Sequence, residues 1–112
     1  MKITRTTDGT MTYEVEGDTH SDLFERLAAI EEVFEENTCG KCGQSDLRHV
    51  VRTVDDNQYF ELKCLNKDCR AKLAFGQNKK GGGLFPKRKD EDGNWKGSNG
   101  WVIWNPKTEK EE

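Results

Sequence analysis

The fold of this chain is decided by two short stretches, Cys39-Gly40-Lys41-Cys42 and Cys64-Leu65-Asn66-Lys67-Asp68-Cys69. Each stretch holds one cysteine pair, and 21 residues lie between the pairs, which is enough for a β-hairpin. Two cysteine pairs at such a spacing are typical of a tetrahedral metal site with four sulfur ligands. The pattern therefore predicts one zinc ion held by Cys39, Cys42, Cys64 and Cys69.

The glycines around the first pair support this interpretation. Gly40 and Gly43 stand where a metal-binding turn must be tight and its backbone N–H groups must point at sulfur. Four cysteine ligands also leave no open position on the metal for water or substrate. The zinc is therefore expected to be structural.

Two alternatives use the same four cysteines. In a secreted protein they would form two disulfides, and in another metal site they would bind iron. Residues 1–6 contain none of the apolar sequence of a signal peptide, so we expect a cytoplasmic location. The reducing cytoplasm favours metal binding over disulfides.

Composition and charge divide the chain into parts. Only 32% of its 112 residues are hydrophobic, so the core is small and a bound metal would offset the shortage. Residues 1–38 carry ten acidic and three basic side chains, whereas residues 39–106 carry thirteen basic and eight acidic ones. We expect an acidic part (1–38), a basic part (39–106) and a disordered charged tail (107–112). No apolar run is long enough to span a membrane.

The acidic part is predicted to form a β-hairpin followed by a helix. Residues 3–7 and 10–16 alternate in polarity around Asp8-Gly9, a dipeptide typical of a two-residue hairpin turn. Thr19 and Asp22 form a capping-box pattern at the start of the helix. One helix face is then apolar, widened by Phe24 and Val33, and consists of Leu23, Leu27, Ile30 and Phe34.

The basic part is predicted to be all β. Residues 47–54 and 58–63 read as strands around a turn at residues 55–57, and residues 71–75 leave the second cysteine pair as a third strand. Residues 100–104 read as a final strand. The layout from Cys39 to Phe75 resembles a zinc ribbon. The predicted fold class is therefore α+β, with a hairpin and helix followed by a four-cysteine antiparallel zinc-ribbon sheet.

Basic and aromatic residues are interleaved between Lys63 and Lys89. This stretch carries nine basic side chains and a single acid, Asp68, with aromatic residues inside and beside it. Single-stranded nucleic acid is bound by this combination, because cations neutralise phosphates while rings stack on unpaired bases. A purely structural interpretation also remains open, in which the rings fill a thin core and the cations solubilise the sheet. Trp101 and Trp104 cannot both face one side of a regular strand, so one of them is exposed or packed under a loop.

Catalysis is not expected. The two histidines, His20 and His49, are isolated, and no serine, histidine and acid pattern indicates a nucleophile. All four thiols are already assigned to the metal. We expect a protein that is not an enzyme.

Three segments resemble one known class of protein. Residues 73–77, residues 82–88 and the pair Gly100-Trp101 are similar to the C-terminal part of small zinc-ribbon proteins encoded by bacteriophages. The resemblance implies single-stranded DNA binding in phage replication or recombination, in the host cytoplasm. It implies that phosphates are contacted by Lys72, Lys79, Lys80, Lys87, Arg88 and Lys89. It also implies that bases stack on Phe85, Trp95 and Trp101.

A second function class remains open. A zinc ribbon also serves as a protein-interaction adaptor or inhibitor, with the acidic helix at residues 19–36 engaging a basic partner. The apolar face of that helix must pack against its own hairpin, the ribbon or a second copy of the chain, so a homodimer is one of the arrangements it allows.

Overall fold

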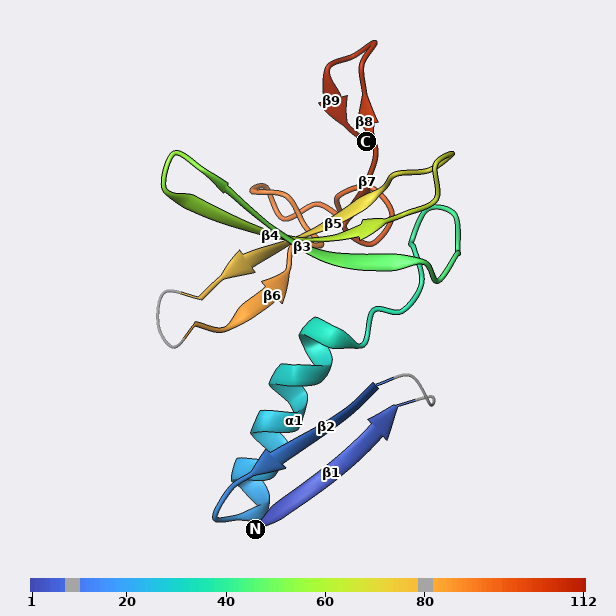
Figure 1. The fold of residues 1–112 in the computed structure, drawn as a ribbon. Coiled ribbons are helices and arrows are strands. Elements are labelled where there is room, and N and C mark those ends of the chain that lie inside the picture. Colours follow the sequence, from blue (N-terminus) through green and yellow to red (C-terminus); the bar gives the residue numbers. More distant parts are fainter. Residues whose placement is uncertain (8–10, 79–81) are drawn as a thin grey trace. The chain divides into compact units, whose positions relative to one another are not determined.

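The chain has a mixed α+β fold, as predicted, in two compact units. The structure is a computed structural model that describes residues 1–7, 11–78 and 82–112. The units are Met1–Glu35 and Glu36–Glu112, so the boundary lies three residues earlier than the sequence indicated. The first unit holds a hairpin and the helix, and the second holds every other strand (Figure 1).

The first unit begins with the predicted hairpin. Strand β1 (Lys2–Thr7) pairs antiparallel with β2 (Met11–Glu16), from Lys2 opposite Glu16 to Thr7 opposite Met11. The turn predicted at Asp8-Gly9 lies outside the described residues.

Helix α1 (His20–Phe34) begins where the capping box predicts. The Thr19 hydroxyl accepts a hydrogen bond from the Asp22 N–H over 3.1 Å, and the Asp22 carboxylate accepts one from the Thr19 N–H over 3.2 Å. These bonds satisfy backbone donors that have no partner inside the first turn of a helix.

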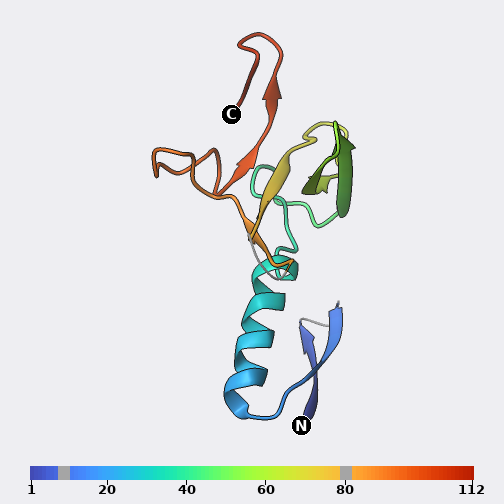
Figure 2. The ribbon, with the colours of Figure 1, turned by 90° about the vertical axis from the view of Figure 1, so that its left-hand side faces the viewer.

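The helix packs along the hairpin (Figure 2). Leu23 on α1 and Val15 on β2 are both buried. The Tyr13 hydroxyl donates to Glu31 over 3.1 Å, and Arg5 forms an ion pair with the same carboxylate at 2.6 Å. By contrast Phe24, which was expected to widen the packed face, is 76% exposed.

The second unit is built on a twisted antiparallel sheet. Strands β3 (Leu47–Val54), β4 (Asn57–Cys64), β5 (Lys72–Gln77) and β6 (Leu84–Pro86) pair in this order, and β7 (Trp101–Val102) also pairs with β5. The β3–β4 hairpin turns at Asp55 and Asp56, which both have positive φ angles, as a two-residue turn with right-handed strand twist requires. Strands β3, β4 and β5 therefore lie close to the predicted ranges, whereas β6 was not predicted from the sequence.

The core of this unit is small and centres on β5. Leu62, Leu73, Trp101 and Val102 are each almost fully buried. A Cβ atom at Gly40 would overlap the Trp101 ring, so only glycine at that position lets the indole pack against the first cysteine turn. The core and the cysteine cluster thus form one packed region.

The C-terminal residues differ from the sequence-based expectation. The expected final strand is divided into β7 and β8 (Trp104–Asn105), and β9 (Lys110–Glu111) pairs with β8 in place of a disordered tail. Ile103 and Glu112 exchange two backbone hydrogen bonds of 3.0 and 2.9 Å, which close the hairpin. These bonds order residues whose composition alone indicates a solvated tail.

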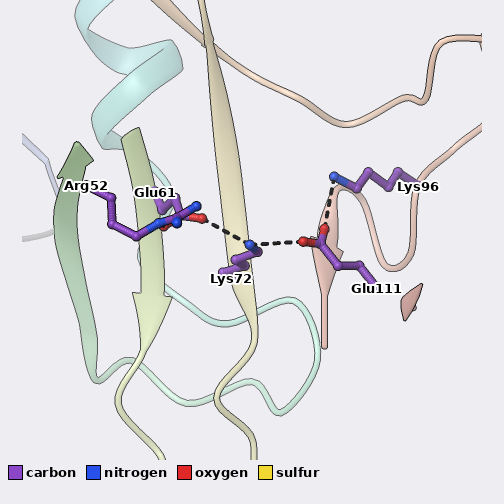
Figure 3. A network of polar contacts seen from close by, with 5 residues as sticks. All are labelled: Arg52, Glu61, Lys72, Lys96 and Glu111. Atoms are coloured by element: carbon purple, nitrogen blue, oxygen red, sulfur yellow. Dashed lines mark hydrogen bonds and ion pairs between the residues drawn. The ribbon is translucent and has the colours of Figure 1, made fainter. Parts of the chain in front are cut away.

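A network of charges links the sheet to this hairpin (Figure 3). Glu61 on β4 is only 4% exposed and binds Arg52 on β3 at 3.0 Å and Lys72 on β5 at 3.1 Å. Lys72 also binds Glu111 on β9 at 3.0 Å, and Glu111 reaches Lys96 at 3.5 Å. Burial by itself would raise the pKa of Glu61, but the hydrogen bonds from Lys72 and Arg52 outweigh it and hold the pKa below its ordinary value.

Replacing Glu61 by glutamine tests the strength of this network. We expect Glu61→Gln to lower the free energy of unfolding by about 1–3 kcal/mol at pH 7, because a buried, doubly paired charge is lost. Since the pKa of Glu61 is lower in the folded state, its stabilisation is present above the unfolded-state value of about 4.3 and is lost as pH falls through the folded-state value. Denaturant titrations over a pH series measure the difference.

Glu91→Gln is the matched control, because Glu91 is exposed in a loop and forms no ion pair among the described residues. It should leave the unfolding free energy unchanged at every pH. Equal stability of the Glu61→Gln and wild-type proteins at pH 7 would contradict a stabilising role for the network.

Candidate metal centre and nucleic-acid interface

The first cysteine turn, residues 39–44, is a tight loop closed by backbone hydrogen bonds. The Cys39 N–H donates to the Gln44 carbonyl over 2.8 Å, and the Gly43 N–H donates to the Cys39 carbonyl over 2.9 Å. The Lys41 N–H points at the Cys39 sulfur from 3.3 Å, as the sequence analysis expected of a metal-binding turn. Gly43 has a φ angle of 75°, which explains glycine there.

The second turn, residues 64–71, contains the other two cysteines. The Cys64 N–H donates to the Ala71 carbonyl and closes the loop at its base. Within it, the N–H groups of Cys69 and Arg70 both donate to the Asn66 carbonyl over 3.0 Å. The Leu65 N–H donates to the carbonyl of Asp46, the residue directly before β3.

The four sulfur atoms form one cluster that could hold a metal ion. All four are free thiols, and their sulfur atoms lie within 4.8 Å of one another. The Cys39–Cys69 and Cys42–Cys64 sulfurs are 3.7 and 3.6 Å apart. A metal about 2.3 Å from each of four tetrahedral sulfurs requires sulfur separations of about 3.8 Å, and these two separations agree with such an ion.

The thiols of the cluster differ in acidity. A hydrogen bond from the Gln44 backbone, helped by the Asn66 side chain, lowers the pKa of Cys42 to about 6. Burial raises the pKa of Cys64 to about 12 and also raises the pKa of Cys69. A bound cation reverses the effect of burial, because it favours the thiolate at every ligand.

The expected phosphate-binding cations that the structure describes differ in whether their charges are paired. Lys72 is held between Glu61 and Glu111, and Arg88 binds Glu36 at 2.7 Å and the Asn99 carbonyl at 2.6 Å. Lys87 is exposed, and Lys89 lies over the Trp95 ring at 4.9 Å. Lys79 and Lys80 lie outside the described residues.

The expected stacking rings differ in their exposure. Trp95 is 64% exposed and Phe85 is 38% exposed. Trp101 is only 1% exposed, because it fills the core beneath Gly40, so no base can reach its ring. Trp104 takes its place as an available ring and is 57% exposed, which fulfils the expectation that these two tryptophans face opposite environments.

Phe85 and Lys87 contribute to one groove, here called the Phe85 groove. It has a volume of about 340 Å³ and is also lined by Tyr59, an exposed ring with the Arg52 guanidinium 5.0 Å from its centre. The groove thus combines two rings with a cation, and the sequence-based set identified only Phe85 and Lys87.

A larger groove, here called the knuckle groove, lies beside the second cysteine turn and has a volume of about 520 Å³. Its lining includes Lys63, Lys67, Arg70, Lys72 and Trp104. Four of these five were outside the sequence-based set. Lys63, Lys67 and Arg70 lie in the basic stretch that the sequence shows, but their position beside Trp104 depends on the C-terminal hairpin.

Comparison of the chain with models of protein families, with curated proteins and with solved structures gives no match. Among the residues that the structure describes, no helix is long and apolar enough to cross a membrane.

Removal of the metal should unfold the second unit. Binding at a site of this kind supplies folding free energy, on the order of 10 kcal/mol in small metal-dependent domains. We expect a strong chelator, or the substitution Cys64→Ser, to abolish cooperative thermal unfolding and the dispersed NMR signals of residues 36–112. Metal analysis should find one ion per wild-type chain.

Lys41→Ala is the matched control, since only the backbone of Lys41 contacts the Cys39 sulfur. This variant should keep its metal and its stability. A fully folded second unit in metal-free protein would contradict the metal's role.

Proposed function

We propose that this chain is a zinc-ribbon protein that binds single-stranded DNA with little sequence preference and is not an enzyme. Two features support the proposal: the sulfur cluster, and a set of exposed rings with cations beside them.

Zinc is the metal that fits the cluster best. Four cysteine ligands in tetrahedral positions are typical of structural zinc, and such a site keeps no position open for a substrate. The chain's own residues hold the ion: Cys39 and Cys42 from the first turn, Cys64 and Cys69 from the second. The ion, when bound, joins the two ends of the β3–β4 hairpin and supplies no chemistry beyond that.

The observation that carries the nucleic-acid proposal is the recurrence of an exposed ring beside a cation. Lys89 lies over Trp95, and Lys87 lines one groove with the exposed rings of Tyr59 and Phe85. In the knuckle groove, Trp104 shares the lining with several cations. A nucleotide has a flat base and an anionic phosphate, so each of these pairs matches one unit of an unpaired strand.

The same observation favours a single strand over a duplex. Exposed rings gain about 1–3 kcal/mol for each base that stacks on them, but a duplex hides the faces of its bases. Stacking and phosphate contact are available to every base, so the arrangement favours binding with little sequence preference.

Binding of an oligothymidylate at several salt concentrations tests the proposal. We expect saturable binding whose affinity falls as salt rises, with a logarithmic slope of about 0.7 for each phosphate neutralised. A duplex of equal length should bind more weakly at the same salt. Fluorescence anisotropy of a labelled oligonucleotide measures both affinities. An affinity independent of salt, or equal affinity for the duplex, would contradict the proposal.

A protein-interaction adaptor is the second candidate function, and one observation favours it. Phe24 is 76% exposed on α1, next to Glu25 on a helix rich in acids. A large exposed ring surrounded by charge is typical of a contact site for another protein. Failure of the wild-type protein to bind oligonucleotides, together with a stoichiometric protein complex that Phe24→Asp disrupts, would favour this function.

A further inference from the structure

Four cations, Lys63, Lys67, Arg70 and Lys72, line the knuckle groove. None of its eight described lining residues is acidic. Lys67 and Arg70 are exposed, Lys63 is half-buried, and none of the three forms an ion pair within the described part of the chain. Their charges are therefore available to an anion.

Two of these cations, Lys67 and Arg70, are carried by the ordered backbone of the second cysteine turn. Arg70 has a φ angle of 57°, a left-handed conformation that its N–H bond to the Asn66 carbonyl helps to maintain. Lys67 lies in the same turn, between Cys64 and Cys69. Metal binding at these two cysteines thus holds both cations in place.

The aromatic residue of the groove, Trp104, lies on a hairpin that the charge network holds. Trp104 pairs across the C-terminal hairpin with Glu111, and the Glu111 carboxylate binds Lys72 on β5. Figure 3 shows Lys72 reaching between Glu61 and Glu111. Lys72 therefore positions the hairpin that carries the ring, while its own charge is balanced by the two carboxylates.

We propose that the knuckle groove is the principal nucleotide site, in which Trp104 stacks on a base and Lys63, Lys67 and Arg70 bind the adjoining phosphates. The inference rests on the single-stranded DNA binding proposed above and assigns it to a particular surface. The groove volume lies within the range of roughly 300–1,000 Å³ that is usual for small-ligand sites. A groove for a bare anion would need only the cations, whereas the exposed ring beside them calls for a ligand that is both flat and anionic.

Three variants test this assignment with a labelled oligothymidylate of about ten nucleotides, within the site sizes typical of single-strand binders. Trp104→Ala should weaken binding about tenfold, and Trp104→Phe should restore most of the affinity because a ring is kept. Arg70→Asn removes a cation but tolerates the left-handed backbone, and it should lower the salt slope by about 0.7.

Tryptophan fluorescence gives a second readout. Quenching by the unlabelled oligonucleotide should fall in Trp104→Phe although its affinity stays near that of the wild type, because the tryptophan of the groove is lost, Trp101 is buried and only Trp95 remains exposed. Metal content and melting temperature should be unchanged in all three variants, which separates a lost contact from a lost fold.

Phe85→Ala probes the other groove and should weaken binding less than Trp104→Ala does, and the outcomes separate the two proposals. Wild-type affinity in Trp104→Ala and Arg70→Asn, with weaker binding by Phe85→Ala, would overturn the assignment to the knuckle groove but leave single-strand binding intact. Absence of oligonucleotide binding by the zinc-loaded wild-type protein would overturn both proposals.

Discussion

Convergence of four sulfur atoms on one point is the constraint on which the second unit depends. The two cysteine turns lie at the ends of a β-hairpin, and the Trp101 indole packs against Gly40 of the first turn. Without a cation, burial raises the pKa of Cys64 and Cys69, so the cluster would hold buried protonated thiols with no further structural use. A bound metal would convert them into ligands and would join the strands, the core and the second turn into one structure.

The charge network extends this structure to the C-terminus. Only 32% of the chain is hydrophobic, and the core has few fully buried side chains. Glu61, Lys72 and Glu111 connect β4, β5 and β9 through paired charges, in a region where the chain has little apolar surface to bury. The same contacts hold the hairpin that carries Trp104, so a stabilising network also positions a ring proposed to bind nucleic acid.

Local signals in the sequence were sufficient for most of the fold. Strands 47–54 and 57–64, the capping box at Thr19 and the cysteine cluster each depend on residues close in sequence or on a recognised spacing. The C-terminal hairpin was not predictable in this way, because it depends on the pairing of Glu111 with Lys72, which is distant in sequence. The residues of the candidate interface were predicted only in part, for the same reason. The sequence shows how many cations and rings there are. It does not show that Arg88 is paired, that Trp101 is buried or that Trp104 is exposed.

We propose that the bound metal holds the knuckle groove in the form that binds single-stranded DNA. The most direct test measures oligothymidylate affinity with one protein sample in three states: as zinc-loaded protein, after chelation, and after zinc is restored. Binding should be lost with the metal and recovered with it, since Lys67 and Arg70 lie in the turn between Cys64 and Cys69. Equal affinity in the metal-free and zinc-loaded states would contradict this proposal.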